Sequence, residues 1–153
     1  MAHFAQINDQ YIVQQVLVIT QEEVNTGNWG DPASWIQTSY NTRSGIYYTP
    51  GSDPYVPDPD QSKAFRKNFA GIGYMYLAYG PEGEGFAPPS PYPSWVMNNF
   101  SYTWEAPVPI PTPNNPPNYE WDEATISWII VPMPVPPPSG DITAPGAAPN
   151  VIG

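Results

Sequence analysis

Apolar and polar positions alternate over short stretches of this chain, and a period of two is typical of β-strands. Residues 3–7 and 11–19 are rich in strand-forming side chains and predict a hairpin around the turn-forming segment 8–10. The alternation falls out of step at the two glutamines at 14–15. A β-bulge there would restore one buried face. The alternative is a run buried on both faces over residues 16–19.

The next segments predict one helical turn, one strand and one long loop. Thr20 and Glu23 have the spacing of a capping box, which predicts a short helix over 21–25. Residues 35–40 alternate as a strand does. Glycines and prolines are spread through residues 41–63, which predict a long surface loop, and loops of this length are usually functional or disordered.

An aromatic and apolar stretch follows at residues 65–79 and predicts a further strand. Gly71 and Gly73 interrupt it, which indicates a bulge or a close approach of another backbone segment. The glycine-rich segment 80–85 predicts a turn, and Phe86 begins the returning strand.

One pattern then occurs twice, namely a Trp-to-Trp stretch followed by alternating prolines. The stretch from Trp95 to Trp104 predicts a hairpin that turns at 98–99, because asparagine tolerates the positive φ of tight turns. The stretch from Trp121 to Trp128 predicts a second hairpin with a four-residue turn. The prolines after the two stretches predict extended, polyproline-like straps; they are Pro107, Pro109, Pro111 and Pro113, then Pro132, Pro134 and Pro136 to Pro138.

These elements predict a mainly β fold of about eight short strands, built from hairpins with long loops between them. A small antiparallel sheet, a sandwich and a barrel-like domain all fit this pattern. A chain of 153 residues has the length of one domain. We expect an all-β domain over residues 1–131, with the long loop at 41–63, and a proline-rich extended arm over residues 132–153.

The amino-acid composition limits the classes of partner that this chain can bind. The formal net charge is −10 with only four basic residues, so nucleic acid is an improbable partner. Prolines and glycines are numerous, at 23 and 12, but an aromatic content of 14% is typical of ordered chains. The absence of cysteine excludes disulfides and thiolate metal sites. No signal peptide and no apolar run long enough for a bilayer are present, so we expect no membrane partner.

Candidate catalytic and metal-binding residues are few. His3 is the only histidine, and no nucleophile motif accompanies it, so it is interpreted as a polar residue of a strand. Calcium could bind Asp53, Asp58 and Asp60, but the prolines between them oppose a wrapped loop and favour solvated charges.

A pair of glycosidase carboxylates is the other catalytic hypothesis. Its candidates are Glu105, Glu120, Asp122 and Glu123. Asp122 and Glu123 fall in a predicted turn, where carboxylates are ordinary residues. We therefore expect no enzymatic activity, no metal and no cofactor.

The four tryptophans of the repeated pattern have three interpretations: cross-strand packing, a protein interface and a sugar-stacking platform. Packing is preferred. The prolines are the better candidates for partner binding, because an extended proline segment loses little entropy when it is immobilised on a neighbour. The candidate partner-binding residues are Trp95, Trp104, Trp121, Trp128, Pro107, Pro109, Pro111, Pro132, Pro134 and Pro136.

Taken together, the motifs resemble a family of small, mostly uncharacterised proteins of marine and cyanobacterial tailed bacteriophages. The motifs that carry the resemblance are MAHFAQIND at the start, SWIQTSYN at 34–41, FRKNFAGIGYMY at 65–76, PPSPYPSWVMN at 88–98, WEAPVPIP at 104–111 and YEWDEATISW at 119–128. They occur in order over most of residues 1–131.

The resemblance implies a phage origin and brings no catalytic residue with it. Together with the missing enzyme signature, it predicts a virion structural protein, made in the host cytoplasm. The preferred form is a capsid decoration, or cement, protein that binds major capsid subunits on the outer surface of the head. A tail or fibre component with an aromatic glycan-binding tip is the alternative, and a carbohydrate-binding module outside the virion is a third. Contacts with other virion proteins and homo-oligomers are both compatible with these roles.

Overall fold

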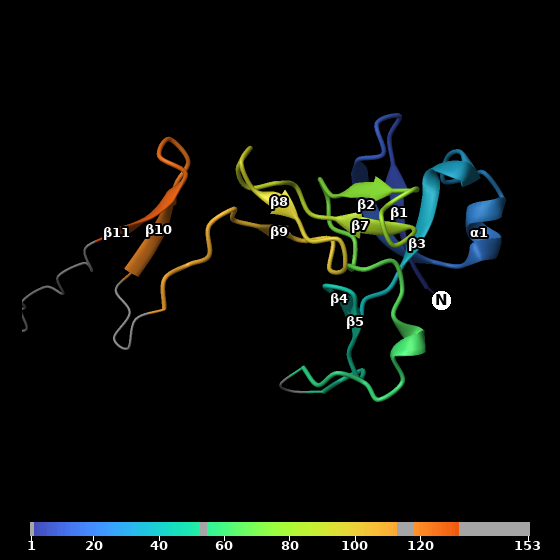
Figure 1. The fold of residues 1–153 in the computed structure, drawn as a ribbon. Helices are drawn as coiled ribbons and strands as arrows, with labels where there is room; N and C mark the ends of the chain where they lie inside the picture. Colours follow the sequence, from blue (N-terminus) through green and yellow to red (C-terminus); the bar gives the residue numbers. More distant parts are fainter. Residues whose placement is uncertain (1, 53–54, 113–117, 132–153) are drawn as a thin grey trace, which may run out of the picture. The chain divides into compact units, whose positions relative to one another are not determined.

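The computed structural model describes residues 2–52, 55–112 and 118–131. It divides the chain into two compact units, Met1–Pro107 and Val108–Gly153. The structure is mainly β, as the alternation predicts (Figure 1). The predicted domain over residues 1–131 extends across both units, and its continuity past Pro107 stays a prediction. The predicted arm at 132–153 lies outside the described residues.

The first unit is built on a three-stranded antiparallel sheet in the order β2–β1–β3. Its strands are β1 (Ala2–Ile7), β2 (Val13–Ile19) and β3 (Trp35–Thr38). The predicted bulge is confirmed, because the register passes from Gln6 opposite Gln15 to Ile7 opposite Val13, which leaves Gln14 as the extra residue.

Four two-stranded antiparallel sheets complete the described strands. They are β4 (Thr42–Arg43) with β5 (Ile46–Tyr47), β6 (Met75–Leu77) with β7 (Gly85–Ala87), β8 (Val96–Met97) with β9 (Trp104–Glu105), and β10 (Asn118–Asp122) with β11 (Ser127–Val131). Of the predicted β architectures, small antiparallel sheets made of short hairpins are the one observed.

Helix α1 (Gln21–Asn25) begins at the predicted capping box. The Glu23 amide donates to the Thr20 hydroxyl at 3.1 Å, and the Thr20 amide donates to the Glu23 carboxylate at 2.9 Å. The helix covers one face of the three-stranded sheet, where Val24 packs with Phe4, Ile19 and Trp35. No helix among the described residues is long and apolar enough to cross a membrane.

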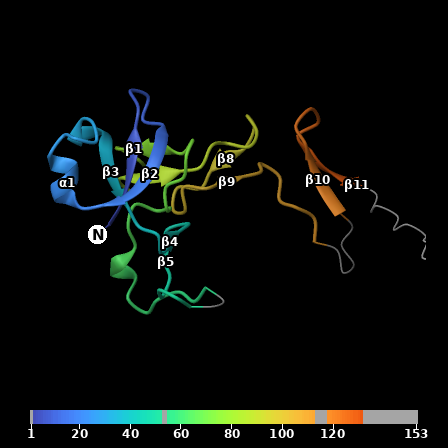
Figure 2. The ribbon, with the colours of Figure 1, turned by 180° about the vertical axis from the view of Figure 1, so that it is seen from behind.

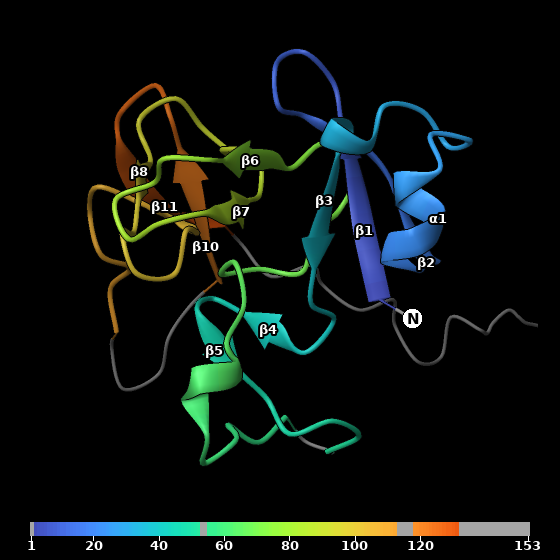
Figure 3. The same ribbon diagram turned by 90° about the vertical axis from the view of Figure 1, so that its right-hand side faces the viewer.

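Strands β6 and β7 cover the opposite face of the same sheet. Ala5 and Val13 pack there with Ala70, Tyr76 and Phe86, and Figure 3 shows α1 and β6–β7 on either side of β1 and β3. Backbone hydrogen bonds join the two sheets, because the Val13 amide donates to the Tyr74 carbonyl at 2.8 Å. The three-stranded sheet is therefore packed on both faces, but the alternative of a run buried on both faces over 16–19 is wrong, because Val18 is 50% exposed.

The predicted long loop at 41–63 is more ordered than expected. Its described residues form β4, β5 and the 3₁₀ turn η2 (Gln61–Lys63), and it extends away from the three-stranded sheet (Figure 2). The other 3₁₀ turn, η1 (Pro32–Ser34), lies before β3. Asp60 caps η2 by accepting from the Ser62 amide at 3.1 Å. Local side-chain caps thus replace the regular ladder that the prolines forbid.

Two strand predictions need correction. The predicted strand at 65–79 is regular only at β6, because Arg66 and Lys67 both have positive φ, at 52° and 70°, which breaks any strand. The predicted two-residue turn at 98–99 is wrong as well. Six residues, 98–103, connect β8 to β9, and the Asn98 side chain accepts the amides of Phe100 and Ser101 at 2.9 and 3.0 Å.

Candidate functional site

The irregular segment 66–68 connects several parts of the first unit. Arg66 and Lys67 lie in the left-handed region, which costs about 1–2 kcal/mol for each residue with a side chain. Asn68 follows them and is buried. A strained backbone of this kind persists only where surrounding contacts stabilise it.

Asn68 supplies those contacts. Its side-chain oxygen accepts the Ser44 amide at 2.8 Å, and its side-chain nitrogen donates to the carbonyls of Phe86 and Ser101 at 2.9 and 2.8 Å. One amide group therefore connects the β4–β5 turn, β7 and the 98–103 connection. Buried polar groups satisfied in this way define a unique packing arrangement.

Tyr102 anchors the 98–103 connection from the other side. It is fully buried, has a φ of 54°, and its hydroxyl donates to the Gly83 carbonyl and accepts the Glu82 amide, both at 2.8 Å. The ring occupies the space beside Gly80 and Gly85, where an added Cβ would lie 2.5 and 2.7 Å from Tyr102 atoms. Gly80 and Gly85 therefore leave the space that this ring fills.

Ion pairs surround this packing. Lys67 pairs with Glu82 at 2.8 Å, and Arg66 pairs with Glu84 at 3.3 Å. Tyr76 donates a hydrogen bond to the same Glu84 carboxylate. Burial, together with that hydrogen bond, raises the pKa of Tyr76 to about 12. These groups satisfy one another, which indicates a structural role for them.

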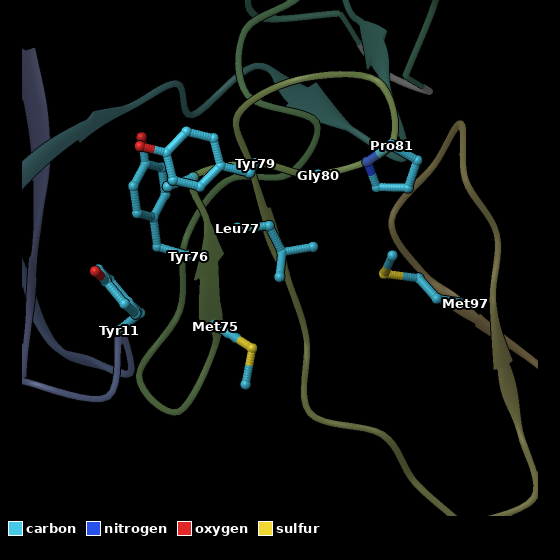
Figure 4. A pocket seen from close by; sticks show the side chains of 9 residues that line it. Tyr11, Met75, Tyr76, Leu77, Tyr79, Gly80, Pro81 and Met97 are labelled. Carbon is cyan, nitrogen blue, oxygen red and sulfur yellow. The ribbon is translucent and has the colours of Figure 1, made fainter.

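An apolar hollow of about 500 Å³ opens beside this framework. Apart from Ser90, its lining is apolar; the residues are Ile12, Gly73, Met75, Leu77, Ala87, Pro88, Pro89, Ser90, Met97 and Trp104. A second hollow of about 350 Å³ adjoins it and shares Met75, Leu77 and Met97. We call the two together the apolar groove. Figure 4 shows those three side chains directed into it from β6 and β8.

The rim of the apolar groove is exposed. Met75 is 43% exposed on the groove wall, and Tyr11 and Tyr79 border the smaller hollow at 53% and 99%. Trp104 is held in the wall because its indole nitrogen donates to the Pro88 carbonyl at 2.7 Å. The lining holds no carboxylate, histidine or lysine and is mostly apolar, so the groove suits the binding of apolar groups.

The four predicted tryptophans have different environments. Trp121 and Trp128 lie opposite each other in the β10–β11 register with their ring centroids 5.2 Å apart, as cross-strand packing requires. Trp104 instead pairs with Met97, and Trp95 precedes β8 and packs on Tyr92 at 5.6 Å. The repeated sequence pattern therefore forms two unlike hairpins.

The prolines of the first strap are exposed. They are Pro107, Pro109 and Pro111. Within the second unit, the strap contacts the hairpin where the Trp128 indole donates to the Val108 carbonyl at 2.8 Å. The predicted partner-binding residues Pro132, Pro134 and Pro136 lie outside the described residues. Partner binding by any of these residues stays a prediction.

The polar residues weighed for chemistry have structural roles where they are described. His3 stacks with Tyr40 and packs edge-on against Phe69. Asp58 accepts the Asp60 amide at 2.8 Å, and hydrogen bonds from Ser62 lower the pKa of Asp60. Among the described residues, no three acidic or histidine side chains are grouped as a metal site would need.

The second hairpin uses its carboxylates in the same way. Glu123 accepts the Trp121 indole proton at 2.9 Å, and Asp122 accepts the Thr125 hydroxyl at 2.5 Å. The sequence pattern predicts the four-residue turn at 122–125, whereas the observed turn spans residues 123–126, where Ile126 has a positive φ of 52°. Both carboxylates thus stabilise the hairpin.

The apolar groove itself was not predicted. Met75 and Met97 lie within the quoted motifs at 65–76 and 88–98, but nothing in the spacing of these motifs indicates that the two side chains meet Leu77 in one groove. Comparison with protein-family models, curated proteins and solved structures gave no match to this chain.

Proposed function

We propose that this chain is a capsid decoration protein of a tailed bacteriophage, which binds the outer surface of major capsid subunits through the apolar groove. The observation that carries the proposal is the groove lined by Met75, Leu77 and Met97, because exposed apolar hollows of this kind mark protein interfaces. The motif resemblance to small tailed-phage proteins supplies the virion context.

The residues around the groove support a protein partner. Tyrosine, tryptophan and methionine are enriched in protein interfaces, and Tyr11, Tyr79 and Trp104 border or line the groove beside its methionines. Methionine side chains adapt to the shape of an incoming apolar group. The net charge of −10 favours a partner surface with basic groups around its apolar contact.

The exposed strap at residues 107–112 would add a second contact. Val108 and Ile110 are 42% and 49% exposed between its prolines. Two weak contacts on one lattice give an avidity that neither has alone. Many copies bound in this way would stabilise a shell by mass action.

The first test is incorporation. Quantitative mass spectrometry of purified virions of the encoding phage should find the chain in copy numbers comparable to the major capsid protein. Absence from the virion would overturn the proposal. A few copies in each particle would instead favour the tail or fibre component, which the half-exposed rings of Tyr40 and Tyr55 also suit as a glycan-stacking surface.

The second test places the interface. Met75→Glu introduces a charge into the groove at a residue that is already 43% exposed, so the fold should tolerate it. We expect binding to capsids that lack the protein to fall at least tenfold, since a charge must then be buried against apolar groups. Val18→Glu is the matched control, because Val18 is 50% exposed and does not line the groove. Equal losses in both variants would exclude the groove.

A further inference from the structure

Arg43 differs from the other basic residues of this acidic chain. Arg66 and Lys67 pair with glutamates, and Lys63 lies near Asp60 and lowers its pKa. Arg43 forms no ion pair with any residue that the structure describes. Its guanidinium lies over the Tyr55 ring at 4.4 Å and over the Tyr40 ring at 6.0 Å, which are cation–π distances.

Both rings are partly exposed, and His3 stacks on one of them, Tyr40. Tyr40 is 51% and Tyr55 is 56% exposed. Further aromatic contacts hold them in place, because Tyr40 packs edge-on against Phe69 at 5.2 Å and Tyr55 packs against Tyr48 at 5.7 Å. The aromatic surface beside the cation is therefore positioned before any ligand arrives, which lowers the entropic cost of binding.

A cavity of about 400 Å³ begins at the same arginine. Arg43 lines it together with Ser44, Asn68, Phe69 and Tyr74. This volume lies in the range of small-molecule sites, about 300–1,000 Å³. Hydroxyl groups and aromatic rings share the lining, so the cavity suits a ligand with both hydroxyl groups and an apolar face.

The cation, the tyrosine rings and the cavity together suit one class of ligand. A guanidinium with no ion pair recognises a carboxylate by two parallel hydrogen bonds. One cation in a chain of net charge −10 suits a single carboxylate, and the surrounding negative charge opposes polyanions. Exposed tyrosine rings pack against the C–H face of a pyranose ring. We propose that Arg43, Tyr40, Tyr55 and the adjoining cavity bind an acidic saccharide, with its carboxylate on Arg43.

This inference does not rest on the decoration role, since a saccharide site would serve either virion location. The test uses the full chain and two probes that differ only in the carboxylate, methyl glucuronide and methyl glucoside. Binding is measured by chemical-shift titration. We expect the glucuronide to bind at least ten times more tightly, with shifts at residues 40–55 and weaker binding at high salt.

Variants locate the contacts. Arg43→Gln should remove the preference for the glucuronide, and Tyr55→Ala should weaken both probes. Lys63→Gln is the matched control, because Lys63 is an exposed cation in the same segment, and it should leave both affinities unchanged. Circular dichroism and thermal unfolding of each variant show that a loss of binding is not a loss of fold.

Three outcomes would overturn the proposal. Equal affinity for the two probes would remove the role of the carboxylate, and no binding of either would remove the site. Acetyl-glutamate amide is the third probe. If it bound as tightly as the glucuronide, the site would instead recognise an acidic protein side chain. Each outcome can be distinguished from failure of capsid binding, which the Met75→Glu variant reports separately.

Discussion

Tyr102 packs directly against Gly85, so closely that a Cβ on Gly85 would lie 2.7 Å from the tyrosine ring. The ring is fully buried and its hydroxyl bonds to the backbone of the same glycine-rich turn. This contact joins the β6–β7 hairpin to the 98–103 connection. The strands on either side of that connection, β8 and β9, line part of the apolar groove. The structure of the groove therefore depends on the packing of Tyr102 against this turn.

Gly85→Ala should destabilise the protein by about 1–3 kcal/mol, the usual cost of inserting a methyl group into a packed core. The φ of Gly85 is not in the left-handed region, so the effect is steric. Chemical denaturation measures the free energy of unfolding. Gly27→Ala is the control, because its Cβ would meet nothing within 4 Å and only its φ of 76° opposes alanine, at about 1 kcal/mol. A smaller loss in Gly85→Ala than in the control would contradict this packing.

Asn68→Asp keeps the shape of the side chain but replaces its amide donor with an acceptor. The Ser44 amide could still donate, whereas the carbonyls of Phe86 and Ser101 would then face a carboxylate. We expect a loss of about 3 kcal/mol or more, since buried acceptors lose their donor and a charge is buried. Asn99→Asp, at an exposed position of the following loop, should change stability by less than about 0.5 kcal/mol. Urea denaturation of both variants checks this.

Tyr76 should make the stability of the protein depend on pH in the alkaline range. Its pKa is raised to about 12 from the ordinary value of 10.0, so the folded state retains the phenol proton that the unfolded state loses first. The resulting stability is fully present below pH 10 and is lost as the pH rises toward 12, by roughly 2 to 3 kcal/mol. Tyr76→Phe should lack this part of the decline. Unfolding free energies of both proteins between pH 9 and 12 measure the difference; parallel curves would refute the shift.

The tryptophan pair of the second hairpin should produce a coupled circular-dichroism signal, because the Trp121 and Trp128 rings lie 5.2 Å apart at 74°. Trp121→Phe and Trp128→Phe should each abolish the whole coupled band, whereas Trp29→Phe, at a 47% exposed residue, should leave it intact. Each substitution in the pair should also cost about 0.5–1.5 kcal/mol of aromatic packing. If the band survived either of the two paired substitutions, the two rings would not be in contact.

The elements that could be predicted from sequence are those whose partners lie close in the chain. The capping box of Thr20 and Glu23 spans three residues, and the bulge at Gln14 interrupts a visible alternation. The hairpin that carries Trp121 and Trp128 follows from two strand-forming runs around a short turn, although its turn lies one residue later than predicted. In each case residue spacing alone brings the groups together, because helix and strand periods are constant.

Only the tertiary structure decided the candidate sites. The Asn68 side chain donates to the Ser101 carbonyl, 33 positions away in the sequence. The Arg43 guanidinium lies over the Tyr55 ring within a proline-rich segment that the sequence predicts to be a loop. No period relates such residues, so their meeting depends on how irregular segments pack. The positive φ values at Arg66, Lys67 and Tyr102 contradict local preference, and long-range contacts outweigh it. The sequence by itself therefore determined the β class and the local hairpins, whereas packing between distant segments decided the groove and the arginine site.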